Sequence, residues 1–239
     1  MVEHLYRRTA STPGVDAVVV ATDDARIAAA VERFGGIARM TRSRHRTGTD
    51  RIAEVVSDVE CDIVVNVQGD LPMIEPSMIA QVLQPFARDP DAHMSTLRQP
   101  ITDPADCTNP NVVKVVVNRQ GDALYFSRAP IPFVRGIGPC HGGPSPTGAG
   151  APEASPAGPD VGLPFYKHIG LYAYRRAFLL SLTALPQTPL EVVESLEQLR
   201  AIEHGFRIAT VETAYESIEV DTPDDIERVR RRLTAGTHA

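Results

Sequence analysis

The stretch AVVVATDDARIAAAVERFGG, residues 17–36, indicates the fold class. Its beginning, AVVVAT, is short, β-branched and continuously apolar, which is typical of a strand buried on both faces of a parallel sheet. Asp23 and Asp24 follow, and aspartate at this position caps the N-terminus of a helix. Gly35 and Gly36 end the helix pattern, because glycine is favoured just past a helix C-terminus. The stretch therefore predicts a strand followed by a helix.

The same alternation continues toward residue 87. The next strand patterns are IARMT (37–41) and DIVVNVQ (62–68), and the next helix patterns are RTGTDRIAEVVSDV (46–59) and SMIAQVLQPFA (77–87). Strands that alternate with helices favour parallel pairing, because a helix carries the chain back to the start of the next strand. The sequence therefore predicts an α/β fold with a doubly wound, mostly parallel sheet.

The second half of the chain departs from this rhythm. NVVKVVVNRQGDALYFSRAPIP (111–132) predicts an inserted β-hairpin. Residues 136–164 are mostly Gly, Pro, Ala and Ser, and they bury too little apolar surface to offset the entropy of ordering. We expect them to form a disordered surface insertion. FYKHIGLYAY (165–174) predicts a strand, and PLEVVESLEQLRAIEHG (189–205) predicts one helix that stops at its glycine.

Composition limits the classes of function. The chain has 239 residues, 43% of them hydrophobic, which is enough for one large α/β core or two small ones. A net charge of −6 argues against a nucleic-acid binder or a polybasic membrane binder, and no apolar stretch is long enough to span a bilayer. The start, MVEHLYRRTA, lacks the apolar core of a signal peptide. Three cysteines without metal-ligand spacing predict a reduced, cytoplasmic protein without structural zinc.

Two aspartates stand where strands give way to other structure. Asp70 ends the strand pattern in VVNVQGDLPMI (64–74), and Asp221 lies between the strand-like SIEV and a helix start. Ligands of open α/β sheets collect beyond the carboxyl ends of the strands, where two carboxylates can share a hard cation such as Mg²⁺. Taken alone, Asp70 suits a turn residue better and Asp221 suits a helix N-cap better. Local sequence leaves both interpretations open.

Six blocks of sequence, taken in their order, resemble one family. They are RSRHRTGTDRIAEV (42–55), VNVQGDLPMI (65–74), ALYFSRAPIP (123–132), HIGLYAY (168–174), PLEVVESLEQLR (189–200) and VDTPDDIERV (220–229). Together they are similar to the 3-deoxy-manno-octulosonate cytidylyltransferases, or CMP-Kdo synthetases. The resemblance covers nearly the whole chain except residues 136–164, and it implies a single cytidylyltransferase domain over residues 1–239.

The resemblance implies a CTP-dependent nucleotidyltransferase. CTP and an acidic, Kdo-like sugar would give the CMP-sugar and pyrophosphate. Asp70 and Asp221 become metal ligands and catalytic residues that hold Mg²⁺, which neutralises charge on the phosphoryl oxygens. The family's hairpin region also implies a homodimer.

The resemblance assigns roles to further residues. Those similar to the cytosine pocket are Arg42, Thr47, Gly48 and Thr49, although Thr47–Thr49 also suits a helix cap. Gln68 resembles a residue that faces the nucleotide or the sugar. Those similar to sugar-binding residues are Arg128, His168, Tyr172, Glu197 and Gln198. Taken alone, His168 suits a structural histidine, Glu197 and Gln198 suit solvated helix positions, and Arg128 suits a dimer surface.

The front of the chain departs from the family pattern. The family begins with a strand and a basic loop around the triphosphate, whereas Met1–Leu5 already resembles the helix that follows them. We therefore expect a domain without its central first strand, in which two neighbouring strand edges are exposed. Either translation starts upstream, or the chain as given folds poorly and has little activity.

Three functions remain open at this stage. The first is the Kdo cytidylyltransferase, which activates the sugar for lipopolysaccharide or another polysaccharide. The second keeps the chemistry but uses another acidic acceptor, such as a sialic-acid-like sugar or a phosphonate. The third is an inactive, truncated remnant. His168, Tyr172, Glu197 and Gln198 together favour the first.

Overall fold

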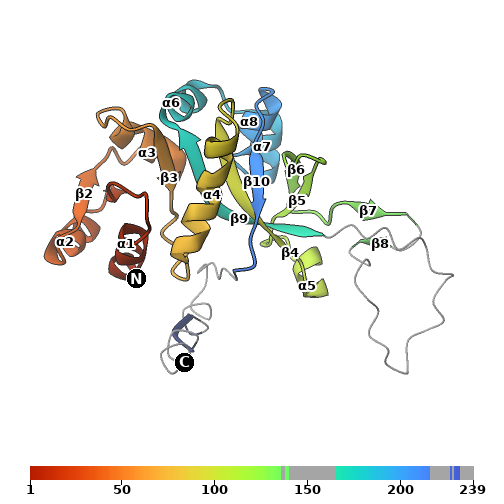
Figure 1. Cartoon of the computed structure of the whole chain (residues 1–239), viewed down its shortest axis with the longest axis horizontal. Coiled ribbons are helices and arrows are strands. Elements are labelled where there is room, and N and C mark those ends of the chain that lie inside the picture. The colour runs from red at the N-terminus through yellow and green to blue at the C-terminus, as the bar shows by residue number, and fades with distance from the viewer. Residues whose placement is uncertain (136–137, 140–164, 216–226, 228, 232–239) are drawn as a thin grey trace.

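The computed structural model describes residues 1–135, 138–139, 165–215, 227 and 229–231 (Figure 1). Its helices are α1 (Val2–Ala10), α2 (Ala25–Arg33), α3 (Gly48–Val56), α4 (Pro76–Arg88), α5 (Pro104–Thr108), α6 (Arg176–Ala184), α7 (Pro189–Glu194) and α8 (Leu199–Glu203). Its strands are β1 (Val19–Thr22), β2 (Ile37–Met40), β3 (Ile63–Asn66), β4 (Met94–Pro100), β5 (Lys114–Val117), β6 (Ala123–Ser127), β7 (Phe133–Val134), β8 (Gly138–Pro139), β9 (Tyr166–Arg175) and β10 (Ala209–Glu212). Asp221 and most of 136–164 lie outside the described residues.

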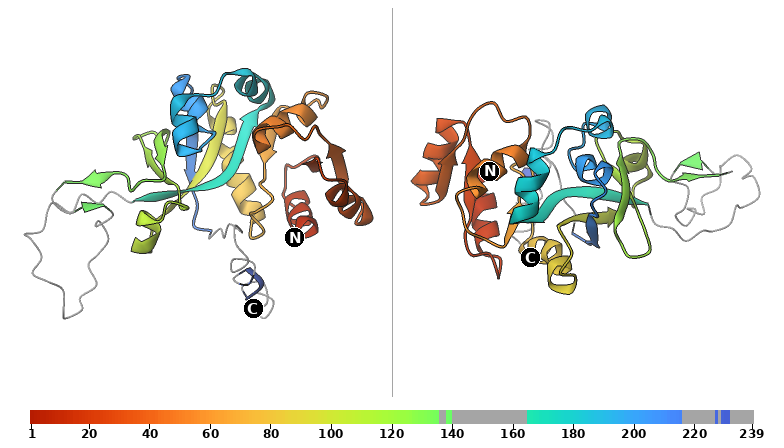
Figure 2. Two further views of the ribbon diagram at one scale, coloured as in Figure 1. Left: turned by 180° about the vertical axis from the view of Figure 1, so that it is seen from behind. Right: turned by 90° about the horizontal axis from the view of Figure 1, so that it is seen from above.

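The larger sheet is built around the long strand β9. Its order is β10-β4-β9-β5-β6, and β3 also pairs with β9. β10 runs parallel to β4, whereas β9 runs antiparallel to β3, β4 and β5. Figure 2 shows β9 running through the molecule between the early elements and the β5–β6 hairpin. The predicted α/β class and the hairpin at 111–132 are thus confirmed, and the sheet is mixed because of β9.

A second, separate sheet contains β1 and β2. They pair in parallel, with Val19 opposite Ile37. Within the described part of the chain, β1 has no other strand partner, and β3 pairs only with β9. Val19–Ala21 and Ile63–Val67 line the same cavity, so the edges of these two strands border a common apolar space. Such edges carry backbone groups that no neighbouring strand satisfies.

The two faces of β9 pack against different helices. Successive side chains of a strand point to opposite faces. Ile169 and Leu171 join a core with α4 and Leu5 of α1, whereas Tyr172 and Tyr174 join a second core with α3, α6 and α8. The larger sheet is therefore covered on both faces, which is what a doubly wound α/β fold requires.

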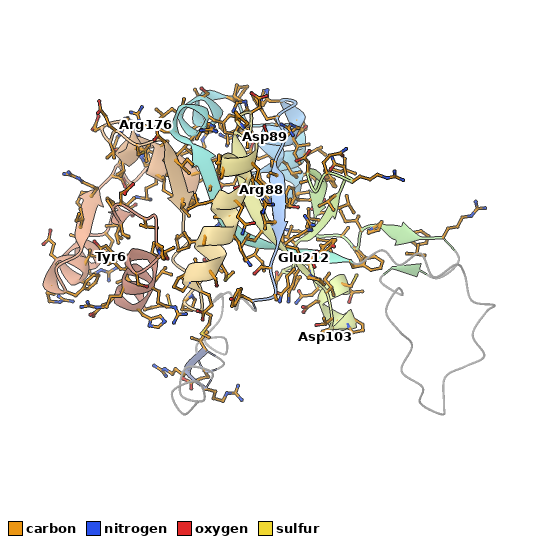
Figure 3. The ribbon with its side chains drawn as sticks, viewed as in Figure 1. Tyr6, Arg88, Asp89, Asp103, Arg176 and Glu212 are labelled. Atoms are coloured by element: carbon orange, nitrogen blue, oxygen red, sulfur yellow. The ribbon has the colours of Figure 1, made fainter. Side chains whose placement is uncertain are left out.

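Local signals place α2 as predicted. The Asp24 side chain caps α2 by accepting from the Arg26 backbone amide at 2.8 Å, and Gly35 adopts φ 79° just past its end. Arg176 at the start of α6 donates to the carbonyl oxygens of Val56 and Ser57, at 3.1 and 2.9 Å (Figure 3). These bonds fix the end of α3, whose start faces the cavity.

The single helix predicted over residues 189–205 is wrong. α7 ends at Glu194, Ser195 adopts the left-handed conformation with φ 54° and ψ 46°, and α8 begins at Leu199. The apolar spacing continued through this region, but periodicity does not report one residue in the left-handed region. The break turns residues 196–198 toward the cavity.

Two expectations from composition have different outcomes. Among the described residues, no helix is long and apolar enough to cross a bilayer. Cys61 is exposed and free, whereas the buried Cys107 is disulfide-bonded. The expectation of reduced thiols is therefore wrong for Cys107.

Candidate active site

One cavity of about 1710 Å³ collects most of the residues that the sequence singled out. It lies between the edges of β1 and β3, the N-terminus of α3, the middle of β9 and the turn between α7 and α8. The predicted residues that line it are Thr47, Gly48, Gln68, Asp70, Arg128, His168, Tyr172, Glu197 and Gln198. These positions span 152 residues of sequence, from 47 to 198, so only the fold brings them together.

Asp70 lies in a turn directly after β3. The turn is closed by the backbone amide of Leu71, which donates to the Gln68 carbonyl at 3.3 Å. Asp70 is half-buried and lines the cavity together with Asn66 and Gln68. This is the carboxyl end of a strand of the larger sheet, where ligands of such sheets bind.

The donors near Asp70 suit a hard cation. Mg²⁺ takes oxygen ligands, commonly one or two carboxylates together with phosphate oxygens and water. Asp70 supplies a carboxylate, and Asn66 and Gln68 supply amide oxygens on the same cavity wall. Within the described ranges, no three His, Cys, Asp or Glu side chains cluster as a preformed metal site. The residues present therefore fit a cation that is held partly by a phosphate-bearing substrate.

The start of α3 forms one side of the cavity. Thr47 caps the helix, and its hydroxyl accepts from the Asp50 amide at 3.1 Å. Gly48 follows as the first helical residue. Thr49 is buried, and its hydroxyl donates to a carboxylate oxygen of Glu197. Thr49 therefore joins α3 to the α7–α8 turn. Within the Thr47–Thr49 segment that suited a helix cap, Thr47 is the N-cap.

Arg42 is not part of the cavity wall. Its side chain is exposed, and its Nε lies 3.2 Å from a carboxylate oxygen of Glu54, which His45 also contacts. An exposed pair of this kind contributes little to stability. The structure thus does not bring Arg42 together with Thr47 and Gly48.

His168 is a buried, neutral histidine on the cavity side of β9. Its Nε2 lies 2.9 Å from the Thr96 hydroxyl, which itself contacts the carbonyl oxygens of Ile169 and Leu171 at 3.1 and 2.9 Å. The contact between His168 and Thr96 therefore joins β9 to β4. Burial lowers the pKa of His168 to about 3, so the ring is uncharged at neutral pH.

Tyr172 lies beside His168 on β9. The two ring centroids are 5.3 Å apart, and Phe126 packs edge-on against the other side of the imidazole at 5.0 Å. Tyr172 is 3% exposed. Both rings are therefore held rigidly, each with an edge on the cavity.

Glu197 and Gln198 come from the turn between α7 and α8. Gln198 is 3% exposed, and Glu197 is half-buried. Burial raises the pKa of the Glu197 carboxyl, against the hydrogen bond that it accepts from Thr49. The interpretation of Glu197 and Gln198 as solvated helix residues is therefore wrong.

Arg128 is held at the end of β6 by Glu194. The carboxylate of Glu194 accepts from the Arg128 amide at 2.9 Å and from the Ser127 hydroxyl at 2.6 Å. Arg128 Nε donates to the Glu194 carbonyl at 2.8 Å, and its Nη1 donates to the Pro110 carbonyl at 2.9 Å. The guanidinium is thus fixed on the cavity wall rather than free on a surface.

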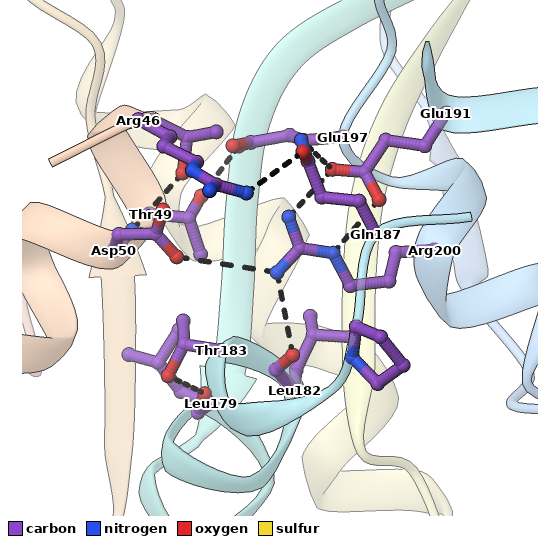
Figure 4. A network of polar contacts seen from close by, with 12 residues as sticks. Arg46, Thr49, Asp50, Leu179, Leu182, Thr183, Gln187, Glu191, Glu197 and Arg200 are labelled. Atoms are coloured by element: carbon purple, nitrogen blue, oxygen red, sulfur yellow. Dashed lines mark hydrogen bonds and ion pairs between the residues drawn. The ribbon is translucent and has the colours of Figure 1, made fainter. Parts of the chain in front are cut away.

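Sequence reasoning missed the polar network behind the α7–α8 turn. Glu191 and Arg200 form a buried pair, and Glu194 anchors β6. One signal was present: Thr188 and Glu191 have the spacing of a capping box, in which the glutamate accepts from the N-cap amide. Nothing local indicates that Arg200 lies near α3 (Figure 4).

The protein combines a mixed α/β sheet with a large cavity beside β1 and β3, and comparison with known proteins identifies the class. The profile of the family described as cytidylyltransferase matches residues 1–208. The 3-deoxy-manno-octulosonate cytidylyltransferase of Pelobacter propionicus is 50% identical over 235 residues, which cover 98% of this chain and 88% of the relative. That of Geobacter sulfurreducens is 51% identical over 233 residues, with the same coverage.

Solved structures give the same result. A CMP:2-keto-3-deoxy-manno-octonic acid synthetase, solved in complex with CTP, superposes with a TM-score of 0.83 at 42% identity, covering 98% of this chain and 88% of that one. A 4-diphosphocytidyl-2C-methyl-D-erythritol synthase from Anaerococcus prevotii has a TM-score of 0.57 at 12% identity, which shows the shared fold. The chain belongs to the 3-deoxy-manno-octulosonate cytidylyltransferase family. The resemblance and the enzyme class expected from the sequence are confirmed, while the roles of individual residues stay predictions.

Proposed function

We propose that this chain transfers CMP from CTP to the anomeric hydroxyl of Kdo and releases pyrophosphate. One observation carries the proposal. Residues that resemble the nucleotide pocket and residues that resemble the sugar pocket line one cavity, at the strand end where α/β sheets bind ligands. The CTP complex of the 42% identical synthetase supports CTP as the donor. The names of the relatives support Kdo as the acceptor.

The nucleotide binds at the start of α3 in this proposal. Thr47 and Gly48 line the cavity at the helix N-terminus, where the first backbone amides have no partner within the helix. Because Gly48 has no side chain, the base edge can approach these amides closely. Gln68 lies on the opposite wall, after β3, and can donate to the nucleotide or to the sugar.

The cation of the proposed reaction is Mg²⁺, held by Asp70 and by Asp221. A divalent cation supplies charge neutralisation on the phosphoryl oxygens of CTP. Asp70 contributes through its position after β3, which directs its carboxylate to the cavity rather than to bulk solvent. Asp221 is proposed from the resemblance alone, since it lies outside the described residues.

The acceptor binds between β9, β6 and the α7–α8 turn. The neutral imidazole of His168 and the Tyr172 ring offer hydrogen bonds and a flat apolar wall to a sugar ring. Glu197 and Gln198 offer acceptors and donors for its hydroxyls. Arg128 is the proposed partner of the sugar carboxylate, because a guanidinium matches a carboxylate with parallel hydrogen bonds.

The reaction is an in-line displacement at the α-phosphorus. The anomeric oxygen of the sugar forms the new P–O bond, and the bond from the α-phosphorus to the pyrophosphate oxygen breaks. The anomeric hydroxyl loses its proton, and pyrophosphate leaves with the bonding electrons. The protein contributes mainly by holding the two substrates in line, which can lower the barrier by several kcal/mol.

We also propose that the protein forms a homodimer and acts in the cytoplasm, where CTP is available. The hairpin region and α7 expose large apolar side chains that a partner subunit would cover: Leu124, Phe133, Val192 and Val193 are 56, 71, 60 and 81% exposed. Exposed apolar residues of this size often mark protein interfaces. Light scattering after size-exclusion chromatography tests this proposal, and a monomer at micromolar concentration refutes it.

An acceptor screen tests the function. Purified protein is incubated with CTP, Mg²⁺ and one acceptor, and pyrophosphate release is measured for Kdo, for a sialic acid and for a phosphonate. We expect release with Kdo to exceed the others by at least about a hundredfold, since unmatched polar groups of the site would be left unpaired by a wrong acceptor. Faster pyrophosphate release with another acid would identify that acid, rather than Kdo, as the acceptor. No release with any acid would favour an inactive remnant.

A further inference from the structure

Arg200 is a buried arginine that joins α8 to three other helices. It is 5% exposed, and its Nε and Nη2 donate to the two carboxylate oxygens of Glu191 at 2.8 and 2.5 Å. Its Nη1 lies 3.9 Å from a carboxylate oxygen of Asp50 and 3.5 Å from the Leu182 carbonyl. Arg200 thus contacts α7 through Glu191, α3 through Asp50 and α6 through Leu182 (Figure 4).

The Glu191–Arg200 pair fixes the start of α7. Glu191 is 4% exposed, and its carboxylate also accepts from the Thr188 amide at 3.2 Å and from Gln187 Nε2 at 3.3 Å. The amide oxygen of Gln187 in turn accepts from Arg46 Nη1 at 3.1 Å. A two-pronged pair between a guanidinium and a carboxylate sets orientation as well as distance. The pair therefore fixes α7 relative to α8.

The turn that this pair closes carries the proposed acceptor ligands. Glu191 and Arg200 stand on either side of Glu197 and Gln198 in the sequence. Within the same turn, Ser195 has φ 54°, a conformation that residues other than glycine adopt at a cost. Contacts outside the turn must therefore hold it, and the buried pair supplies one such contact across its two ends.

Charge gives Arg200 a second effect on the turn. Glu197 faces Thr49 and Asp50 of α3 and the Tyr174 ring of β9. Burial raises the pKa of Glu197, and Asp50 raises it further, whereas Arg200 lowers it. Arg200 is thus a cation between three carboxylates, those of Asp50, Glu191 and Glu197. Without it they would repel one another in a poorly hydrated place.

We propose that Arg200 is a positioning residue that holds Glu197 and Gln198 against the start of α3, so that the acceptor pocket and the nucleotide pocket keep their relative placement. The inference rests on the proposed function. Arg200 is absent from the cavity lining and acts through Glu191, Asp50 and Glu197.

The kinetic test compares three variants with wild type. Arg200→Met removes the charge and both prongs, and Arg200→Lys keeps the charge but loses the two-pronged geometry. Glu191→Gln/Arg200→Met also neutralises Glu191, the carboxylate that loses its two-pronged partner. We expect Arg200→Met to raise the KM for Kdo about ten- to a hundredfold, because small displacements of a ligand-binding turn have effects of this size. Arg200→Lys should fall between Arg200→Met and wild type. The double variant should fold and still show the raised KM.

The affinity for CTP is the internal comparison. Thr47 caps α3 through a bond within that helix, so CTP binding by calorimetry should change less than about threefold in each variant. The matched control is Arg98→Met. Arg98 is also largely buried and donates to the Thr210 carbonyl at 3.0 Å, but it is not among the residues that line the cavity. Arg98→Met should lower the free energy of unfolding without changing the KM for Kdo or the affinity for CTP.

A second readout does not depend on turnover. Carboxyl carbons of labelled glutamate are titrated by NMR, with Glu197→Gln used to assign the signal, and Arg200→Met should raise the pKa of Glu197. If the wild type is active, an unchanged KM for Kdo in Arg200→Met overturns the inference. An unchanged pKa of Glu197 in Arg200→Met also overturns it. A wild type that releases no pyrophosphate with Kdo refutes the proposed function instead, and the titration alone then decides the role of Arg200.

Discussion

Replacing Asp70 with asparagine separates a turn residue from a metal ligand. The turn after β3 is closed by backbone groups, with the Leu71 amide 3.3 Å from the Gln68 carbonyl, and the substitution leaves these unchanged. Asparagine is also a good turn residue, and the site is only half-buried. We therefore expect the free energy of unfolding without ligand to change by less than about 0.5 kcal/mol.

The effect of Asp70→Asn on turnover should be much larger. Among the described cavity-lining residues near the end of β3, Asp70 is the carboxylate, while Asn66 and Gln68 offer only neutral oxygens. Loss of one charge beside a divalent cation weakens the stabilisation of the developing phosphoryl charge. A loss of at least about a hundredfold in kcat, or about 2.7 kcal/mol, is expected from the cost of removing one such group.

The assay is pyrophosphate release from CTP and Kdo across a range of Mg²⁺ concentrations. Asp91→Asn is the matched control, because Asp91 is exposed, lies outside the cavity and carries the same charge. The control should match wild type at every Mg²⁺ concentration. Near-wild-type release by Asp70→Asn at low Mg²⁺ would show that Asp70 is an ordinary turn residue and would refute the reasoning.

Three further predictions concern stability. The pKa of His168 in the folded protein, about 3, lies below its ordinary 6.5, so on acidification the unfolded chain binds a proton that the folded chain does not bind. The contribution of the neutral imidazole to the free energy of unfolding is therefore full above pH 6.5 and is lost as the pH falls, by up to about 1.4 kcal/mol per pH unit. His168→Gln should flatten the decline of the free energy of unfolding between pH 6.5 and 4. Lys114 is fully buried and donates to three backbone carbonyls, at 2.9, 2.6 and 2.6 Å. Lys114→Met should therefore lower the free energy of unfolding in urea by about 1–3 kcal/mol. An unchanged urea midpoint would contradict this prediction. Because the edges of β1 and β3 border one apolar cavity, residues 1–239 should bind ANS at neutral pH. Fusing an extended Val/Ile-rich strand ahead of Val2 should lower the ANS fluorescence. Equal fluorescence with and without the fused strand would contradict an open cavity between these strand edges.

Much of the fold followed from short-range patterns. The strand at 17–22, the Asp24 cap and the glycine stop define β1 and α2 because such preferences act within one turn of chain. The hairpin at 111–132 was predicted in the same way and is present as β5 and β6. The antiparallel course of β9 was not, because the direction of a strand depends on partners far away in sequence.

The candidate site was only partly predictable. The resemblance pointed to residues that line one cavity in the structure. It also assigned Arg42 to the nucleotide pocket, whereas the guanidinium of Arg42 contacts Glu54 outside the cavity wall. The helix expected over 189–205 hid the turn that presents Glu197, because one residue at φ 54° leaves no trace in apolar spacing.

The sequence by itself determined the α/β class, most element positions and the family, because these depend on local preferences and on matching blocks of residues. Only the tertiary structure decided that His168 is buried and uncharged, that Thr49 donates to Glu197, 148 positions away, and that Arg200 lies between α3 and α7. Burial and charge pairing arise when distant segments exclude water together, so no short stretch of sequence contains them.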